Sequence, residues 1–167
     1  MATIRELTRD DAAGIARVHV RAWQAAYAGL VDQAVLDGLT VEARTAEWRD
    51  VWLATPNEGT RLVAEVDGET VGFVVGALES AYTSGCGEIY SIYLDPDHWR
   101  GGIGTALFTR AIAELRADAP IPLVLWVLEG NDPAIAFYER HGWRGDGGRK
   151  DEPLGASVAP HLRYRLD

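Results

Sequence analysis

The fold of this chain is decided by one stretch, Ile89-Tyr-Ser-Ile-Tyr-Leu94-Asp-Pro-Asp-His-Trp99-Arg-Gly-Gly-Ile-Gly104-Thr-Ala-Leu107. An apolar run with aromatic residues breaks at Asp95-Pro96, passes through glycines and enters a helical pattern, which predicts a strand, a turn and a helix. Glycines let the backbone approach a ligand closely, so that several N–H groups can point at one anion beside the positive end of the helix. The stretch therefore predicts a pyrophosphate site; a turn that needs glycine only for packing is the alternative.

Three kinds of phosphate loop are distinguished by their spacing. A P-loop requires a Gly-Lys pair, and the chain contains none. A Rossmann fingerprint requires a third small residue where Leu107 stands and an acidic residue about 20 positions later, where the chain has an apolar run instead. The third pattern, Leu/Val-x-Pro-x-x-Gln/Arg-x-x-Gly-x-Gly/Ala, is matched from Leu94 to Gly104 except at Trp99. This segment resembles the acetyl-CoA pyrophosphate loop of the GCN5-related N-acetyltransferase (GNAT) family, in which tryptophan is a tolerated variant at that position.

A second motif lies downstream. The apolar run Pro122–Leu128 is followed by Asn131-Asp-Pro-Ala134-Ile-Ala-Phe137-Tyr138-Glu-Arg-His-Gly142-Trp143. The run predicts a buried strand, and the rest predicts a helix that Asn131 or Asp132 caps and that ends at a glycine. The GNAT family carries Asn-x-x-Ala-x-x-Phe-Tyr-x-x-x-Gly-Phe after its fifth strand, and only the closing Phe is replaced here, by Trp143. The two motifs make the resemblance specific over residues 88 to 143.

Composition and charge limit the alternatives. The chain has 167 residues, 47% of them hydrophobic, which favours a single domain over residues 1–167. The net charge of −9 argues against a nucleic-acid or anionic-membrane surface, because such binding requires a cationic footprint. Cys86 is the only cysteine and the four histidines lack metal-ligand spacing, so neither a disulfide nor a metal site is predicted. With no signal segment and no apolar run of membrane-spanning length, a cytoplasmic protein is expected.

The remaining elements flank the two motifs. A first strand is predicted over Thr3–Leu7, and a helix capped by Thr8 follows it. A second helical region reaches about Thr55, is interrupted near Gly38-Leu-Thr40 and is closed by Pro56-Asn-Glu-Gly59. Asp67-Gly68 is a strong hairpin signal. The other predicted elements are strands Arg61–Val66, Thr70–Val75, Glu88–Leu94, Pro122–Leu128, Trp143–Arg149 and His161–Leu166, with helices Ile103–Arg116 and Ala134–His141. This order predicts a mixed α/β sheet.

The resemblance implies the GNAT acyl-CoA N-acyltransferase fold. In this fold a central, mostly antiparallel sheet is flanked by helices, and its fourth and fifth strands splay so that pantetheine lies between them. The backbone amides from Arg100 to Thr105 would bind the pyrophosphate of acetyl-CoA, and the Leu94 amide would polarise the thioester carbonyl. The cofactor-binding residues implied are Ile92, Tyr93, Leu94, Trp99, Arg100, Gly101, Gly102, Ile103, Gly104, Thr105, Asn131, Ala134 and Tyr138.

Two residues are the main candidates for catalysis. Tyr138 corresponds to the tyrosine that, in many members of the family, protonates the departing thiolate; the alternative is a packing residue with a satisfied hydroxyl. Glu88 begins a strand where the family often places a carboxylate that acts as a base through water, although a solvated glutamate is the simpler interpretation. Glu79 is a second candidate for the base. For Asn131, capping a helix and contacting pantetheine both remain open.

The acceptor pocket is less well specified. The resemblance nominates Trp23, Tyr27, Glu79, Tyr82 and Tyr90, and core packing is the alternative for the aromatic ones. Aromatic walls near carboxylates suit an amine on an apolar or aromatic stem, through cation–π contacts and charge pairing. The sequence names no acceptor.

Together these features predict an acetyl-CoA-dependent N-acetyltransferase. It would transfer the acetyl group to a primary amine, in a small molecule, by direct attack in a ternary complex. The alternatives are a non-catalytic acyl-CoA-binding or regulatory module and a protein N-terminal acetyltransferase; a dinucleotide-dependent oxidoreductase is disfavoured by the missing third glycine. A homodimer is expected because family members commonly pair.

Overall fold

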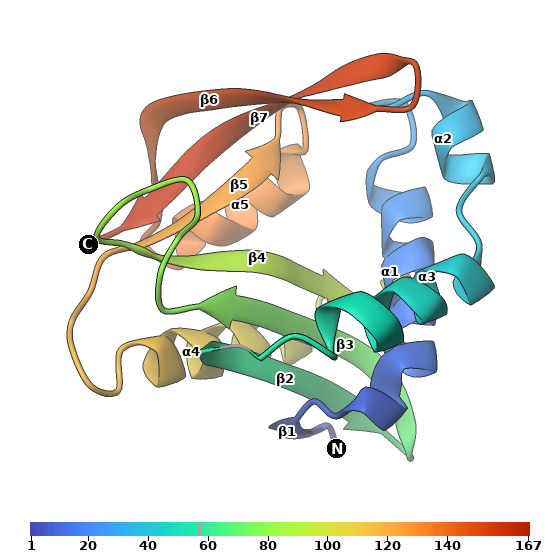
Figure 1. The fold of residues 1–167 in the computed structure, drawn as a ribbon, viewed down its shortest axis with the longest axis horizontal. Helices are drawn as coiled ribbons and strands as arrows, with labels where there is room; N and C mark the ends of the chain where they lie inside the picture. Colours follow the sequence, from blue (N-terminus) through green and yellow to red (C-terminus); the bar gives the residue numbers. More distant parts are fainter. Residues whose placement is uncertain (57) are drawn as a thin grey trace.

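The protein is built around one seven-stranded sheet with the order β1-β2-β3-β4-β5-β7-β6 (Figure 1). All neighbouring strands are antiparallel except β4 and β5, which are parallel. The computed structural model describes residues 1–56 and 58–167, so the predicted turn Pro56–Gly59 contains one position, Asn57, outside the described residues. The strands are β1 Thr3–Glu6, β2 Gly59–Val66, β3 Glu69–Ala77, β4 Gly87–Leu94, β5 Leu123–Leu128, β6 Arg144–Leu154 and β7 Ser157–Leu166. The predicted mixed α/β fold is confirmed.

Helices cover both faces of this sheet. They are α1 Ala12–Ala26, α2 Gln33–Asp37, α3 Val41–Glu47, α4 Ile103–Leu115 and α5 Asp132–Arg140, and a π-helical turn, Trp48–Trp52, continues α3. On one face α1 and Trp48 pack against Val63, Phe73 and Val75. On the other face α4 packs through Leu107 and Phe108, and Figure 1 shows this helix passing behind the sheet. Two apolar layers therefore bury the central strands from both sides.

Short-range signals place most element boundaries. The β2–β3 hairpin turns at Asp67 and Gly68, whose φ angles of 52° and 82° are the positive values that such a turn requires. Thr40 caps α3 by accepting a hydrogen bond from the Ala43 N–H at 3.2 Å, so the predicted interruption of the second helical region is confirmed. Within the described residues, no helix combines the length and the apolarity that crossing a membrane requires.

A bulge in β4 opens the sheet. Val75 pairs with Ser91 and Gly76 with Ile89, which leaves Tyr90 as an extra residue. The parallel pairing of β4 with β5 covers only Gly87–Ile89 and stops at this point. A bulge bends and twists its strand, so β4 leaves β5 beyond residue 90. The predicted splay of the fourth and fifth strands is confirmed, and its local cause is one unpaired residue.

The C-terminal hairpin is longer than the sequence suggested. The predicted strands Trp143–Arg149 and His161–Leu166 were too short, because β6 runs to Leu154 and β7 begins at Ser157. The predicted part of β7 is the part that pairs with β5, whereas its first residues pair only with β6. Glycine, proline and charged residues are weak strand signals, and they dominate this outer ribbon. The ribbon reaches α2 (Figure 1), where the Ser157 hydroxyl donates to Asp32 at 2.9 Å.

Candidate active site

A cleft of about 770 Å³ lies where β4 and β5 separate. Its walls come from the end of α1, the splayed strands, the glycine turn before α4, and α5. Most of the residues implied for cofactor binding line it: Ile92, Tyr93, Leu94, Trp99, Arg100, Gly102, Gly104, Thr105, Asn131, Ala134 and Tyr138. Gly101 and Ile103 do not line it, and Ile103 packs against the core on the α4 side. The structure thus brings the two sequence motifs together around one cavity.

The glycine turn presents backbone N–H groups at one end of the cleft. Arg100 and Gly102 both have left-handed backbones, with φ angles of 63° and 84°, and Gly102 is the N-cap of α4. The first intrahelical bond runs from the Ala106 N–H to the Gly102 carbonyl at 3.0 Å. The N–H groups before it, in the first turn of the helix, have no partner within the helix and are suited to an anion. Arg140 also lines the cleft and was not among the residues predicted from the sequence.

Trp99 fixes the end of β4. Its indole Nε1–H donates to the Leu94 carbonyl oxygen at 2.8 Å. The side chain therefore supplies an N–H donor at the position where the family pattern has Gln or Arg. This contact ties the glycine turn to the strand that enters it.

Tyr138 borders the cleft from α5. Its ring packs against Phe108 and Phe137, at centroid distances of 5.6 Å and 5.7 Å. Burial raises the pKa of its hydroxyl, and the neighbouring Tyr93 adds to this shift. No hydrogen-bond partner of this hydroxyl is found among the residues that the structure describes. A protonated phenol that faces the cleft without a protein acceptor is available to donate to a bound group.

Asn131 closes the same wall. Its side-chain oxygen accepts a hydrogen bond from the Ala134 N–H at 3.4 Å, and the residue also lines the cleft. Capping of α5 is therefore observed, and contact with pantetheine stays a prediction.

Glu88 is a buried carboxylate near the cleft. Its side chain is not solvated, because the residue is only 2% exposed. It accepts a hydrogen bond from the Ser80 hydroxyl, which itself accepts from the N–H groups of Tyr82 and Thr83 at 3.1 Å each. Burial raises the pKa of Glu88, while the Ser80 hydrogen bond and the charge of Lys150 oppose that rise. Glu88 does not itself line the cleft, but the next two residues of β4 do.

The other candidate for the base lies elsewhere. Glu79 lines a separate cavity of about 470 Å³ together with Cys86, whose thiol is buried. No group of three or more His, Cys, Asp or Glu side chains is placed to hold a metal ion in the part of the chain that the structure describes.

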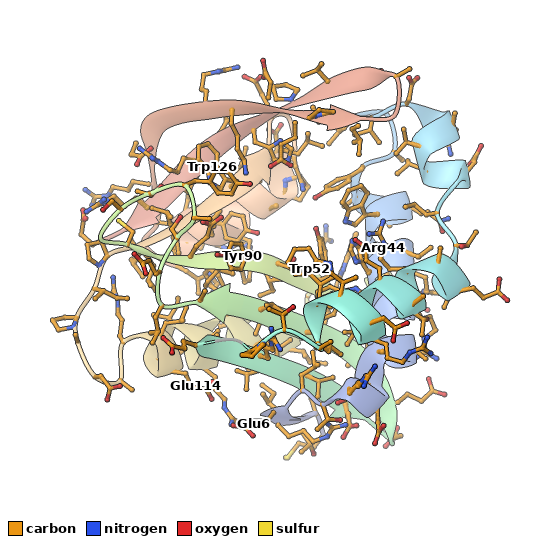
Figure 2. The ribbon with its side chains drawn as sticks, viewed as in Figure 1. Glu6, Arg44, Trp52, Tyr90, Glu114 and Trp126 are labelled. Atoms are coloured by element: carbon orange, nitrogen blue, oxygen red, sulfur yellow. The ribbon has the colours of Figure 1, made fainter. Side chains whose placement is uncertain are left out.

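Two of the five predicted acceptor residues line the cleft. Tyr27 and Tyr90 do so, whereas Trp23, Glu79 and Tyr82 do not. The ring of Trp23 packs against that of Tyr27, with centroids 4.8 Å apart. Burial raises the pKa of Tyr27 well above its ordinary value, and Tyr93 adds to this shift. Tyr82 is 63% exposed in the loop 78–86. Figure 2 labels Tyr90 over β4 and Trp126 beside that loop.

Three further residues at this side were missed by sequence reasoning. Trp126 of β5 lines the cleft, and the Lys150 Nζ lies 4.7 Å from its ring centroid. Lys150 also forms an ion pair with Glu152, with Nζ 2.6 Å from Oε1. Lys150 and Glu152 belong to the part of β6 that the predicted strand did not reach. The one available signal was that Lys150 is the only lysine in the chain.

Comparisons with known proteins agree with this architecture. Residues 15–143 match the model of the acetyltransferase (GNAT) family. The N-acetyltransferase YuaI of Bacillus subtilis is 30% identical over 142 residues, which are 84% of this chain and 79% of that protein.

Solved structures that share the fold include one in complex with coenzyme A and one with acetyl-CoA. The PaiA N-acetyltransferase of Thermoplasma acidophilum, in complex with coenzyme A, is 19% identical with a TM-score of 0.71, over 97% of this chain and 98% of that one. An acetyltransferase of Salmonella typhimurium with its cofactor acetyl-CoA is 20% identical with a TM-score of 0.70, over 100% and 94%. The family model covers both sequence motifs and the strands that form the cleft, and the chain accordingly belongs to the acetyltransferase (GNAT) family.

Proposed function

We propose that this protein is an acetyl-CoA-dependent N-acetyltransferase that acetylates a primary amine of a small molecule by direct attack in a ternary complex. The observation that carries the proposal is the continuity of one cleft, from the N-terminus of α4 through the gap between β4 and β5 to Tyr138. Residues 1–167 would act as one domain, because the walls of the cleft draw on segments from α1 to α5.

The donor would lie along the backbone. The amides from Arg100 to Thr105 bind the pyrophosphate, and the guanidinium groups of Arg100 and Arg140 add positive charge for the phosphates. Pantetheine extends between the strand edges that the bulge at Tyr90 leaves unpaired. Acetyl-CoA, the typical donor of the family, supplies the thioester.

The reaction needs three proton transfers. Glu88 accepts a proton from the acceptor's ammonium through a water, and its raised pKa makes it a better base than an ordinary glutamate. The amine nitrogen then bonds to the thioester carbonyl carbon, and the C–S bond breaks. Tyr138 donates its proton to the departing thiolate, and it recovers a proton from the amine that has become an amide.

A binding screen followed by a turnover assay tests this proposal. Acetyl-CoA at about 100 times its dissociation constant should stabilise the protein by roughly 2.7 kcal/mol, whereas NAD and ATP should not. Release of free CoA is then measured across aliphatic amines, aromatic amines and peptides with free N-termini. Binding without release by any amine would favour the non-catalytic module, and release with peptides alone would favour an N-terminal acetyltransferase. Stabilisation by NAD instead of acetyl-CoA would contradict the proposal.

We also propose a homodimer in the cytoplasm, where acetyl-CoA is available. Val51 and Trp52 of the π-helical turn are 56% and 49% exposed, which leaves apolar surface for a second copy. Light scattering at micromolar concentration should report twice the monomer mass, and a monomer alone would contradict the pairing.

A further inference from the structure

The only lysine of the chain is enclosed at the acceptor side of the cleft. Lys150 is the single lysine among 16 lysines and arginines, and its side chain is 20% exposed. Its Nζ lies 2.6 Å from Glu152 Oε1, 4.2 Å from the ring centroid of Tyr82 and 4.7 Å from that of Trp126. Trp126 lines the cleft and the other residues around Nζ do not, so this ammonium lies beside the cleft, against the ring of one residue of its wall.

The surroundings of Nζ are those that bind a primary ammonium. A carboxylate supplies the opposite charge, and two aromatic faces supply cation–π attraction. The group that they enclose is an ammonium at the end of a four-carbon stem. A primary amine acceptor presents the same chemical group. The position of Lys150 therefore indicates that these residues can bind a primary ammonium.

Glu152 carries the negative charge of this enclosure, and its side chain is 46% exposed. Burial is the main cause of the raised pKa of Glu88, and the charge of Glu152 adds to it. Among the described residues, Lys150 is the one cation within ion-pair distance of Glu152.

We propose that Glu152, Tyr82 and Trp126 form the binding site for the acceptor's ammonium, and that Lys150 occupies this site until an acceptor displaces it. This inference rests on the proposed function and names its substrate class. The acceptor is a monocationic primary amine on an apolar or aromatic stem. An amino acid is disfavoured, because its carboxylate would lie close to those of Glu152 and Glu88.

The test measures amine binding without turnover. Phenethylamine is titrated calorimetrically into the protein saturated with CoA, which carries no acetyl group to transfer. Lys150→Met removes the competitor and should tighten phenethylamine binding roughly tenfold, the factor that corresponds to about 1.4 kcal/mol. Glu152→Gln removes the partner and should weaken binding by a similar factor. An ion pair with a purely structural role predicts weakening by both variants, so the opposite signs are diagnostic.

Matched controls isolate the effect. Arg149→Met and Asp151→Asn make the same charge changes at exposed neighbours on β6 and should leave the affinity unchanged. L-Phenylalanine, which is phenethylamine with an added carboxylate, should bind at least tenfold more weakly, and neutral 2-phenylethanol should not distinguish the variants. The inference is overturned if both variants change affinity in the same direction, if neither does, if phenethylamine binds none of the proteins, or if L-phenylalanine binds equally well. Loss of CoA binding or of all acetyl transfer would contradict the proposed function instead.

Discussion

The two ends of the cleft differ in the groups that form them: one is formed mainly by backbone and the other by side chains. The donor end consists of backbone from one continuous segment, the edge of β4 and the turn before α4, with left-handed residues at Arg100 and Gly102. The acceptor end that we propose consists of side chains of the cleft from α1, β4 and β5, together with side chains beside the cleft from the loop 78–86 and β6, and these come together only in the folded chain. A site made of consecutive backbone leaves a motif in the sequence, and a site made of dispersed side chains does not.

The two ends also differ in charge. Unpaired N–H groups and two arginines, Arg100 and Arg140, face the donor end. At the proposed acceptor end there are two carboxylates, Glu88 and Glu152, and one lysine whose ammonium lies over the rings of Tyr82 and Trp126. One end is therefore suited to an anion and the other to a cation, and perturbing each end separately should produce separable effects.

The largest effect should come from blocking the backbone of the donor end. Gly104 lines the cleft, and a Cβ added there would lie 3.8 Å from the ring of Phe137, so the branched side chain of Gly104→Val would fill the space above the amides. Acetyl-CoA affinity, measured by calorimetry, should fall by roughly 100-fold or more, which corresponds to about 2.7 kcal/mol. Gly145→Val is the control, because Gly145 does not line the cleft and a Cβ added there would lie 3.7 Å from the ring of Tyr164. Equal losses from both variants would mean that the effect does not come from the glycine turn.

A substitution at Tyr138 should lower the rate of turnover without lowering the affinity for acetyl-CoA. Tyr138→Phe removes one hydroxyl without emptying the cleft, so acetyl-CoA affinity should hold while kcat drops on the order of 10²-fold. Affinity is measured by calorimetry, and kcat with any accepted amine under conditions where chemistry limits the rate. Tyr164→Phe is the control, because its hydroxyl bonds Glu139 at 3.3 Å and Tyr164 does not line the cleft. An unchanged kcat for Tyr138→Phe would reject the acid role.

A smaller effect should come from His19, a buried residue that packs against the cleft residue Tyr93. His19 stacks on Tyr93 at a centroid distance of 4.8 Å, and burial lowers its pKa to about 3 from the ordinary 6.5. Below pH 6.5 the unfolded chain binds a proton that the folded chain excludes, so folding stability falls as pH decreases toward 3. This residue should contribute up to roughly 1.4 kcal/mol per pH unit over that window. Urea unfolding at pH 7, 6 and 5 should show a shallower decline for His19→Gln than for the wild type, and parallel declines would contradict the assignment.

The smallest effect should appear in the pH dependence of turnover. A base works only when deprotonated, so kcat/KM should rise with pH through the pKa of Glu88, which lies above its ordinary value of 4.5. The Ser80 hydrogen bond lowers that pKa, so Ser80→Ala should move the acid limb to higher pH and leave the rate at alkaline pH nearly unchanged. Thr83→Val, in the same loop, is the control, because its hydroxyl accepts from Arg163 and does not contact Glu88. An acid limb that stays in place would exclude Glu88 as the base.

Much of the fold could be predicted because its signals are local. The Asp67-Gly68 turn, the Asn131 cap and the glycine that ends α5, Gly142 with φ of 84°, each act within a few residues. The outer half of the β6–β7 hairpin could not be predicted in this way, because its residues are poor strand formers held by pairing with each other.

In the candidate site, too, local contacts could be predicted from the sequence and contacts between distant elements could not. Glu79 and Glu88 look equivalent in sequence, and only the folding of the loop 78–86 over β4 buries the second of them. Lys150 and Glu152 are two positions apart on one strand, so their contact with each other is local. Their contact with Tyr82 and Trp126 depends on elements far away along the chain, which no spacing rule reports.

The unpaired Tyr90 also changes the parity of its strand. Side chains alternate between the two faces of a strand, so residues separated by an odd number belong on opposite sides. Ile89 and Ile92 are three apart, yet both pack into the core on the α4 side, while Tyr93 packs with the α1 side. The extra residue thus lets two isoleucines that are three positions apart face the same side of the sheet. If every residue of β4 paired regularly, without the bulge, Ile92 would turn to the α1 face and Tyr93 to the core under α4, so the place of Tyr93 at the cleft depends on this one unpaired residue.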